Sequence, residues 1–324
     1  MTAAGPRRDT RGIVDAAELL ARVRFRRHDP APDLRPYLEH YWLIDWDLSV
    51  PYASHVVPHP SVNIVFQRYD EVAGNGGGDG DGDGPANHDG PSGLSRHTGH
   101  EGHAGPERRE RRPAAPERTT TLAELSGIGL DLFTKKLTGV GRVCGIQFRP
   151  GGFRPFAPAW PVSEWTGRRV PLDEVFTDAG AASLEAVLGP ESDHARVAAL
   201  DAFLLAHGPA PDPQATQAME LVQLARTDRS IRRVSELARA AGLSSRSLQR
   251  LFAHHVGVGP KWVILRYRIH EALERAEATG PQGSPDWAGL AAELGYSDQA
   301  HLVRDFTATV GVPPTAYTRR VSDP

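Results

Sequence analysis

Residues 243–252 read LSSRSLQRLF, a short polar turn followed by a segment with one apolar side. Ser244 can cap a helix that we expect over residues 245–255. The apolar positions recur at helical spacing and predict the buried side of that helix: Leu248, Leu251 and Phe252. Directly upstream, Gly242 can adopt the left-handed conformation that ends a preceding helix. The stretch therefore predicts a tight turn leading into an amphipathic helix.

The segment before this turn also has helical periodicity. Its apolar face is formed by Val234, Leu237, Ala238 and Ala241. Ala238 is small enough to let a second helix cross closely. Together, the two segments predict a helix-turn-helix.

The same pattern occurs a second time, 53 to 54 residues later. The first copy consists of Ala238, Gly242, Ser244, Leu248, Arg250, Phe252, Gly257 and Pro260, and the second of Ala291, Gly295, Ser297, Leu302, Arg304, Phe306, Gly311 and Pro314. The second copy has one extra residue between Ser297 and Leu302. Leu290, Ala291 and Leu294 are expected to face inward, Ser297 to act as the cap, and a second helix to run from about Asp298 to Val310.

The outward faces of the two expected reading helices carry side chains that can contact base edges. In the first helix these are Arg246, Gln249 and Arg250; in the second they are Gln299, Ala300, Val303 and Arg304. Arginine can bond guanine and glutamine can bond adenine bidentately, while valine can contact a thymine methyl group. On a lone helix such residues usually form only a solvated surface, but the tandem favours DNA contact.

A long helix is expected between the two copies. Pro260 suits its first turn, and residues 261–278 continue it for about 27 Å. A rod of this length can hold two reading helices about one turn of DNA apart.

Four strings give the C-terminal part a family resemblance. They are residues 243–252, 257–260, 294–299 and 311–314, the last followed by Tyr317. The region from Ile231 to Arg320 resembles the DNA-binding domain of the AraC/XylS family of bacterial transcription regulators. The resemblance implies seven helices, two helix-turn-helix units and reading helices in successive major grooves. The chain departs from the family at residues 300–302, which speaks against strong direct reading by the second unit.

Composition is compatible with a two-domain regulator. The net charge of the 324 residues is -3, but residues 226–320 hold 14 Arg and Lys against 9 Asp and Glu, or +5, which leaves -8 elsewhere. A basic domain attracts phosphates, and an acidic remainder does not compete for the duplex. One cysteine excludes an internal disulfide framework. No signal peptide or long apolar run occurs, so we expect a cytoplasmic protein without membrane association.

The N-terminal part has strand patterns interrupted by a low-complexity tract. Residues 55–58, 62–66 and 140–148 are rich in β-branched side chains and predict strands. Residues 74–116 are rich in Gly, Asp, His and Pro and have almost no apolar side chains, so we expect a disordered insertion. Within it, the Asp-Gly repeat at residues 79–84 is better explained by low complexity than by a calcium loop.

A short string connects this part with a second group of proteins. Residues 148–152 read Phe-Arg-Pro-Gly-Gly, and Val170-Pro171-Leu172 follows later. The string resembles the uncharacterised N-terminal domain of some AraC-like regulators, which implies a cupin-like β domain that senses a compound or dimerises. Residues 151–152 predict a tight turn at a strand end. We favour a structural carboxylate over a bound anion as the partner of Arg149.

Alternative chemistry would need a metal site or a reactive thiol. His40, His55 and His59 could belong to a cupin-like metal site, although strand-end histidines are the favoured interpretation. Cys144 lies in an apolar run, where a buried inert thiol is favoured over a redox sensor. A DNA-tethered enzyme or metal sensor using either group is the alternative function.

The sequence thus predicts an α+β protein of two domains. We expect a flexible segment at 1–20, a β-rich cupin-like domain at 21–200, connecting helices at 201–225, and an all-α domain at 226–320 with two helix-turn-helix units joined by a long helix. The expected function is sequence-specific transcription regulation, without enzymatic activity, cofactor or metal. The expected partner is double-stranded DNA. A small-molecule effector, RNA polymerase in the case of an activator, and a second copy of the chain are compatible with this function.

Overall fold

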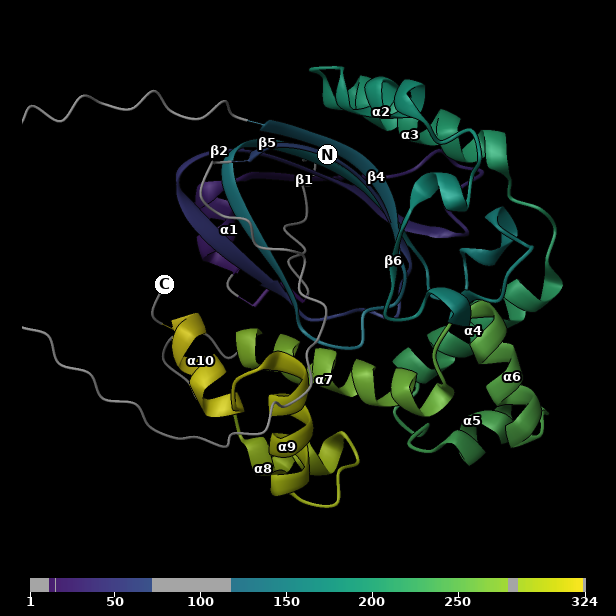
Figure 1. Cartoon of the computed structure of the whole chain (residues 1–324). Helices are drawn as coiled ribbons and strands as arrows, with labels where there is room; N and C mark the ends of the chain where they lie inside the picture. Colours follow the sequence, from purple (N-terminus) through teal and green to yellow (C-terminus); the bar gives the residue numbers. More distant parts are fainter. Residues whose placement is uncertain (1–11, 15, 72–117, 279–284, 323–324) are drawn as a thin grey trace, which may run out of the picture.

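The computed structural model describes residues 12–14, 16–71, 118–278 and 285–322. The expected insertion at 74–116 and most of the expected flexible segment at 1–20 lie outside them. Figure 1 shows a curved sheet in the N-terminal half and a row of helices along one end of it. The part of the chain that the structure describes has six strands: β1 (Arg24–His28), β2 (Leu38–Val56), β3 (Asn63–Glu71), β4 (Arg118–Ser126), β5 (Phe133–Phe148) and β6 (Arg169–Pro171).

The strands form one sheet in the order β1-β2-β5-β3-β4-β6, in which all neighbouring strands are antiparallel. The strands expected at 62–66 and 140–148 are present as parts of β3 and β5, but of the segment expected at 55–58 only His55 and Val56 lie in a strand. They form the end of the longer β2, which pairs with β5 along most of its length. The β-rich prediction for this half of the chain is confirmed.

The two faces of the sheet have separate apolar clusters. On one face, Trp42 and Trp46 lie over Gly145 and Gly141, their partners on β5; a Cβ on either glycine would come within 2.0 Å of the tryptophan ring. Helix α1 (Ala16–Arg22) packs on this face through Leu19. The opposite face is covered by helices α2 (Ala181–Leu188) and α3 (Asp193–His207).

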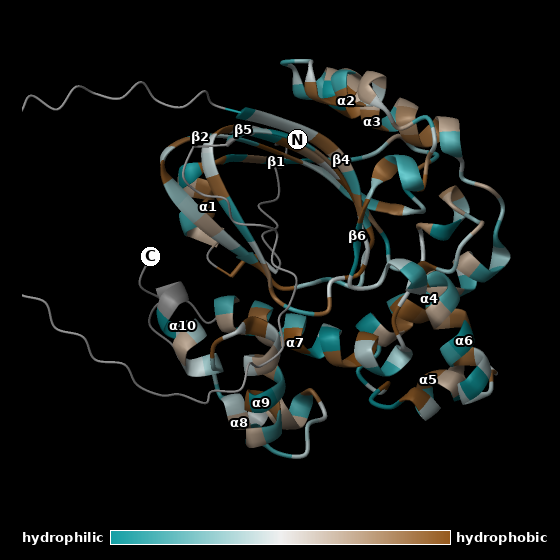
Figure 2. Cartoon of the chain, viewed as in Figure 1, coloured by the Kyte–Doolittle hydropathy of each residue, from teal (hydrophilic) through white to brown (hydrophobic). Residues whose placement is uncertain are grey.

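Among the described residues, seven helices follow α3. They are α4 (Pro213–Thr227), α5 (Val234–Ala240), α6 (Ser245–His255), α7 (Pro260–Ala278), α8 (Trp287–Glu293), α9 (Gln299–Val310) and α10 (Pro314–Ser322). The expected count of seven is reached only with α4, so the expected boundary at residue 226 falls in the last turn of a helix. The reason is that Leu221 and Val222 of α4 belong to the same buried cluster as α6 and α7. Figure 2 shows that these helices carry both apolar and hydrophilic residues.

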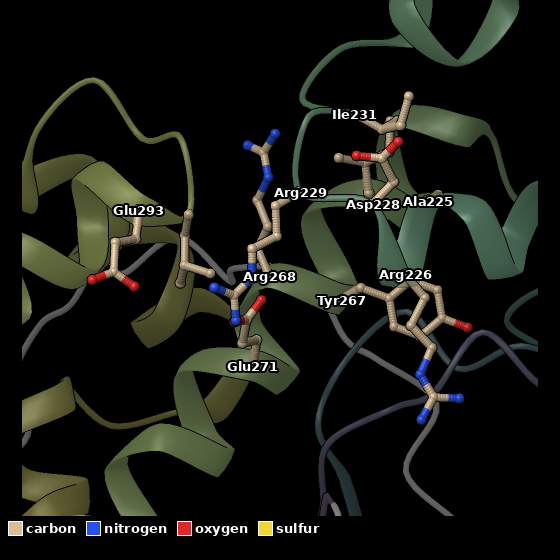
Figure 3. A pocket seen from close by; sticks show the side chains of 11 residues that line it. Ala225, Arg226, Asp228, Arg229, Ile231, Tyr267, Arg268, Glu271 and Glu293 are labelled. Carbon is tan, nitrogen blue, oxygen red and sulfur yellow. The ribbon is translucent and has the colours of Figure 1, made fainter. Parts of the chain in front are cut away.

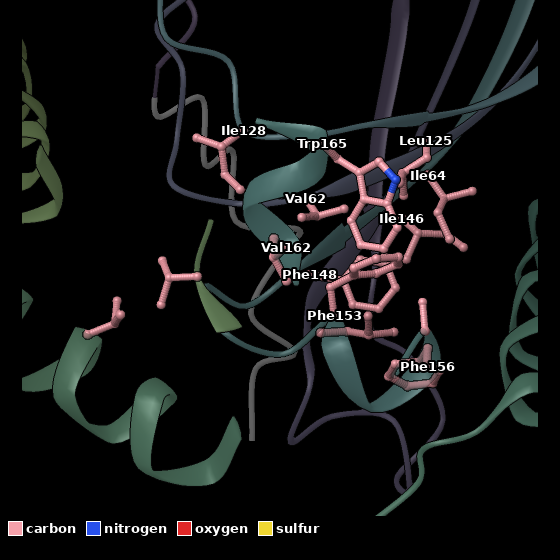
Figure 4. Packing of buried hydrophobic residues seen from close by; sticks show 14 of the residues in the cluster. Val62, Ile64, Leu125, Ile128, Ile146, Phe148, Phe153, Phe156, Val162 and Trp165 are labelled. Carbon is pink, nitrogen blue, oxygen red and sulfur yellow. The ribbon is translucent and has the colours of Figure 1, made fainter. Parts of the chain in front are cut away.

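One hydrophobic cluster contains side chains of the sheet and of helices α4 to α7. Three short 3-10 helices follow β5: η1 (Arg154–Phe156), η2 (Val162–Trp165) and η3 (Leu172–Glu174). Phe148, at the end of β5, stacks edge-to-face with Phe153 just before η1 and with Phe156 of η1, and Phe153 stacks in the same way with Trp165 of η2 (Figure 4). Val256 and Val258, next to α6, belong to the same cluster. The sheet therefore docks directly on the helices of the candidate site.

Candidate nucleic-acid interface

Helices α5 and α6 form the first helix-turn-helix unit as expected. Gly242 has φ +64°, in the left-handed region that ends α5. Ser244 then caps α6, because its side chain accepts a hydrogen bond from the backbone N–H of Ser247 at 3.1 Å. The inward side chains Leu237, Ala238, Leu248, Leu251 and Phe252 are all buried. This packing fixes which face of α6 points outward.

The outward face of α6 presents the three side chains that the sequence predicted. Arg246, Gln249 and Arg250 are exposed. None of the three has a hydrogen bond or ion pair with the residues that the structure describes. In a helix-turn-helix, the N-terminal part of the second helix contacts base edges in the major groove. These unbonded polar groups are therefore available to a ligand on that side.

Helices α8 and α9 form the second unit, and its inner side is also as expected. Leu290, Ala291, Leu294, Leu302 and Phe306 are buried. Gly295 has φ +76° at the turn. Each unit therefore has a glycine with a positive φ in the turn that precedes its reading helix.

The expected cap of the second unit is wrong. The N-cap of α9 is Asp298, which accepts a hydrogen bond from the backbone N–H of His301 at 2.8 Å, and not Ser297. The extra residue of the second copy explains the difference. Asp298 stands four residues before Leu302, as Ser244 stands four residues before Leu248. This hydrogen bond holds the pKa of the Asp298 carboxyl below its ordinary value, which keeps a negative charge at the start of α9.

The outward face of α9 is less polar than that of α6. Gln299, Ala300 and Arg304 are exposed, whereas Val303 is half-buried. Counted from the cap, Ala300 and Val303 occupy the places of Arg246 and Gln249. Arg304 occupies the place of Arg250.

Helix α7 connects the two units, and a narrow cleft lies beside it. Its 19 residues span about 28 Å. The cleft is lined by charged side chains from the end of α4 and the segment after it, from α7 and from α8 (Figure 3), among them Arg229, Arg268, Glu271 and Glu293. The sequence analysis did not single out these residues. A concentration of arginines was the available signal: Arg226, Arg229, Arg232, Arg233 and Arg239.

The sheet contacts the same helices through polar groups as well. The Thr166 hydroxyl donates to the carbonyl of Gly257, just after α6, at 2.7 Å. Arg266 of α7 donates from Nη2 to the carbonyl of Leu130 at 2.9 Å. Burial lowers the pKa of the Arg266 guanidinium to about 10. The loop after α6 and the connecting helix are thus attached at separate points to segments that flank the sheet, the end of η2 and the loop between β4 and β5.

Comparison with known protein families agrees with this geometry. Residues 237–320 match the family model of a helix-turn-helix domain, which covers both units and α7. This region is an AraC-type helix-turn-helix domain. Residues 26–171 match a domain of unknown function, DUF6597, which covers the sheet. With its AraC-type domain, the chain is a DNA-binding transcription regulator.

Several solved structures are similar to the chain. The C-terminal domain of AraT, a response regulator from Geobacillus stearothermophilus, is 18% identical, with 33% of this chain and 88% of that chain covered and a TM-score of 0.30. An AraC-type transcriptional regulator from Chromobacterium violaceum is 21% identical, with 33% and 94% covered and a TM-score of 0.30. ToxT from Vibrio cholerae is 10% identical, with 86% and 97% covered and a TM-score of 0.38. No curated protein matches the sequence significantly.

The groups named in the alternative function lie in surroundings that do not assemble a site within the described residues. His55 Nδ1 lies 2.9 Å from the hydroxyl of Thr134, and His59 Nδ1 lies 2.8 Å from that of Ser61. Among the described residues, no group of three or more His, Cys, Asp or Glu is arranged to hold a metal ion. Cys144 is fully buried, and burial raises the pKa of its thiol to about 12. Such a thiol stays protonated and unreactive.

The remaining expectations for the N-terminal half concern its turn and the partner of Arg149. Gly151 has φ +92° directly after β5, which confirms the tight turn. Arg149 Nε donates to the carbonyls of Arg35 and Leu38, and its Nη1 lies 4.0 Å from Glu39, so its contacts are structural. Trp46 and Trp165 are buried, whereas Trp160 is exposed.

No helix in the described part of the chain is long and apolar enough to span a membrane.

Proposed function

We propose that the chain binds an asymmetric DNA site by placing α6 and α9 in two successive major grooves, with α7 as the spacer. One observation carries the proposal. The exposed side chains Arg246, Gln249 and Arg250 are unbonded within the described residues, while the other side of α6 is buried. Arginine and glutamine at these places can read guanine and adenine. Phosphate contacts, favoured by the net positive charge of the domain, would supply most of the affinity.

The two units contribute unequally to sequence reading in this proposal. Arg304 is the long cationic side chain on the reading face of α9, and Gln299 lies at its first turn. Ala300 and Val303 offer only apolar contacts, and Asp298 places a carboxylate where the helix meets the groove. A carboxylate near DNA phosphates is repelled by them. We therefore expect α6 to read sequence strongly and α9 to contribute a weaker motif.

In this proposal the protein is cytoplasmic. Its sheet region, meaning the sheet with the 3-10 helices that follow β5, would control DNA binding. It contacts α4, α6 and α7 through the shared apolar cluster and through Thr166 and Arg266. An effector bound to the sheet region can change DNA affinity only if its own affinity differs between two arrangements of these contacts. A small-molecule effector, RNA polymerase and a second copy of the chain are the further partners that this scheme allows.

Site selection from a random DNA pool with the full chain, at fixed salt near 0.15 M, tests the proposal. Two enriched motifs about ten base pairs apart are expected, the stronger one belonging to α6. On the selected site, Arg250→Ala should weaken binding by about 1–3 kcal/mol and relax the preference at one position of the stronger motif.

The matched control is Arg118→Ala, which removes the same charge from an exposed position on β4, outside the helical half. It should change affinity only slightly. If Arg250→Ala and Arg118→Ala lose equal affinity for the selected site and the selected motif does not change, α6 does not read the DNA sequence.

A further inference from the structure

The two reading units touch each other beside α7. The Arg232 side chain, from the segment before α5, lies against Gly295 in the turn between α8 and α9. A Cβ on Gly295 would be 2.7 Å from Cδ and 3.0 Å from Nε of Arg232. The turn of the second unit therefore accommodates a side chain of the first, in addition to needing a positive φ.

Arg268 of α7 bonds the same segment of the first unit and lies against the second. Its Nη2 donates to the carbonyl of Arg232 at 2.6 Å. Its guanidinium carbon lies 5.7 Å from the ring centroid of Tyr296, which is buried directly after Gly295. The N–H of Arg232 is held as well, since it donates to the Glu236 carboxylate at 2.6 Å. Arg268 thus joins a fixed stretch of the first unit to the turn of the second.

A second connection runs parallel to this one along the cleft. Arg229, before α5, pairs with Glu271 of α7 at 2.6 Å. Glu271 also pairs with Arg275 at 3.1 Å, and Arg275 pairs with Glu293 of α8 at 2.8 Å. Figure 3 shows Arg229, Arg268 and Glu271 close together beside α7. We call the two connections the inter-unit clasp, made of Arg229, Arg232, Arg268, Glu271, Arg275, Glu293 and Tyr296.

A connecting helix alone sets the distance between two units but leaves each unit free to pivot on its loops. Successive base pairs of DNA rotate by roughly one tenth of a turn, so a pivot changes which spacing of two motifs fits. We propose that the inter-unit clasp fixes the rotation of α9 relative to α6 and thereby selects the number of base pairs between the two motifs. This inference depends on the proposed two-groove binding. Arg268 is a positioning residue in it, because it acts through both units rather than on a base.

The test measures relative affinity of the full chain for duplexes that carry the selected site with its spacer shortened or lengthened by one and two base pairs. The wild type should prefer the selected spacer at least tenfold over either change of one base pair. Arg268→Ala should reduce this preference at least threefold. Affinity for a duplex with only the α6 motif should stay within twofold, because Arg268 is not on a reading face.

Two further variants keep the test decisive. Glu271→Gln removes the negative charge that Arg229 and Arg275 share and keeps nearly the same shape. It should also reduce the spacer preference, and it replaces Arg268→Ala in the test if that variant does not fold. Arg319→Ala removes an exposed charge from α10 and should leave the preference unchanged.

The outcomes separate the clasp from the proposed function. A wild type that binds a duplex with only the α6 motif as tightly as the complete site would overturn both. A wild type that needs both motifs but shows no spacer preference would overturn the clasp alone. A wild-type preference that Arg268→Ala and Glu271→Gln leave intact, or a uniform loss of affinity for every spacer, would overturn the clasp alone.

Discussion

His255 Nε2, at the C-terminal end of α6, lies 3.4 Å from Oδ2 of Asp212, the residue that caps α4. The same oxygen of Asp212 accepts a hydrogen bond from Arg154 Nη1 of η1 at 2.6 Å. Asp212 also accepts the backbone N–H groups of Gln214 and Ala215 through its other oxygen. One carboxylate thus connects the sheet region, α4 and the first reading helix.

This arrangement predicts a loss of stability in mild acid. Burial lowers the pKa of His255 to about 4, although Asp212 partly opposes the effect. The unfolded chain takes up this proton near pH 6.5, whereas the folded chain resists it. The contribution of neutral His255 to the free energy of unfolding is therefore complete above pH 6.5 and decreases as pH falls toward 4.

Thermal unfolding of the full chain at pH 7.5 and pH 5.5 checks this prediction. The wild type should lose more of its Tm between the two pH values than His255→Gln does, because glutamine does not titrate. His194→Gln is the control, since His194 is exposed on α3. A His255→Gln variant with the pH dependence of the wild type would contradict the prediction.

Gly257 determines how closely the loop after α6 docks on the sheet region. Its φ is +94°, and an added Cβ would lie 2.7 Å from Ile128 Cδ1 and 3.0 Å from the Thr166 hydroxyl. Gly257→Ala should therefore lower the free energy of unfolding by about 1–3 kcal/mol, through backbone strain and the clash. Gly259→Ala is the matched control, because nothing lies within 4 Å of its added Cβ. Equal midpoints of denaturant unfolding for the two variants would show that the loop is not tightly docked.

Ala238 lies where α5 crosses the rest of the first unit, and it is buried. Ala238→Leu should reduce the free energy of unfolding by about 1–3 kcal/mol, because three more carbon atoms must fit into a packed crossing. Ala240→Leu makes the same change at an exposed position of α5 and should have little effect. The two variants can be compared by urea unfolding. Similar urea midpoints for the two variants would show that α5 does not cross the unit at Ala238.

Local signals made much of the candidate interface predictable. A turn glycine such as Gly242 and a cap such as Ser244 act within a few residues, so their pattern predicts the geometry directly. The bounds of α6 and the burial of Phe252 were predicted correctly for the same reason. The error at Ser297 arose because serine and aspartate are both good caps, and the inserted residue moved the cap by one position.

Long-range contacts could not be predicted in this way. Helix α4 packs with α6 and α7, but no local feature of its sequence assigns it to the reading domain. The contact of Arg232 with Gly295 joins residues 63 positions apart, and the glycine is explained equally well by its turn. Only the fold brings such residues together, and the inter-unit clasp depends on it.

The difference between the two caps predicts how DNA affinity can be changed at each unit. Asp298 is exposed and charged at the start of α9, whereas Ser244 is neutral at the start of α6. Asp298→Ser keeps a side chain that can cap the helix and removes one negative charge near the expected DNA backbone. It should strengthen binding about two- to tenfold near 0.15 M salt, because one exposed like-charge contact costs on the order of 1 kcal/mol. The helix itself should lose only about 0.3–1 kcal/mol of dipole stabilisation.

The reciprocal change, Ser244→Asp, is the matched control at the first unit. It keeps a good cap and adds one negative charge at the start of α6, so it should weaken binding by a similar factor without destabilising the helix. Both effects should shrink as salt is raised from 0.05 to 0.5 M, because exposed charges are then screened. Equilibrium binding of the selected duplex across this salt range measures both variants. Opposite signs that converge at high salt would place both helix starts at the DNA. An effect of Ser244→Asp without one of Asp298→Ser would mean that α9 lies away from the backbone, and the site would then be read by α6 alone.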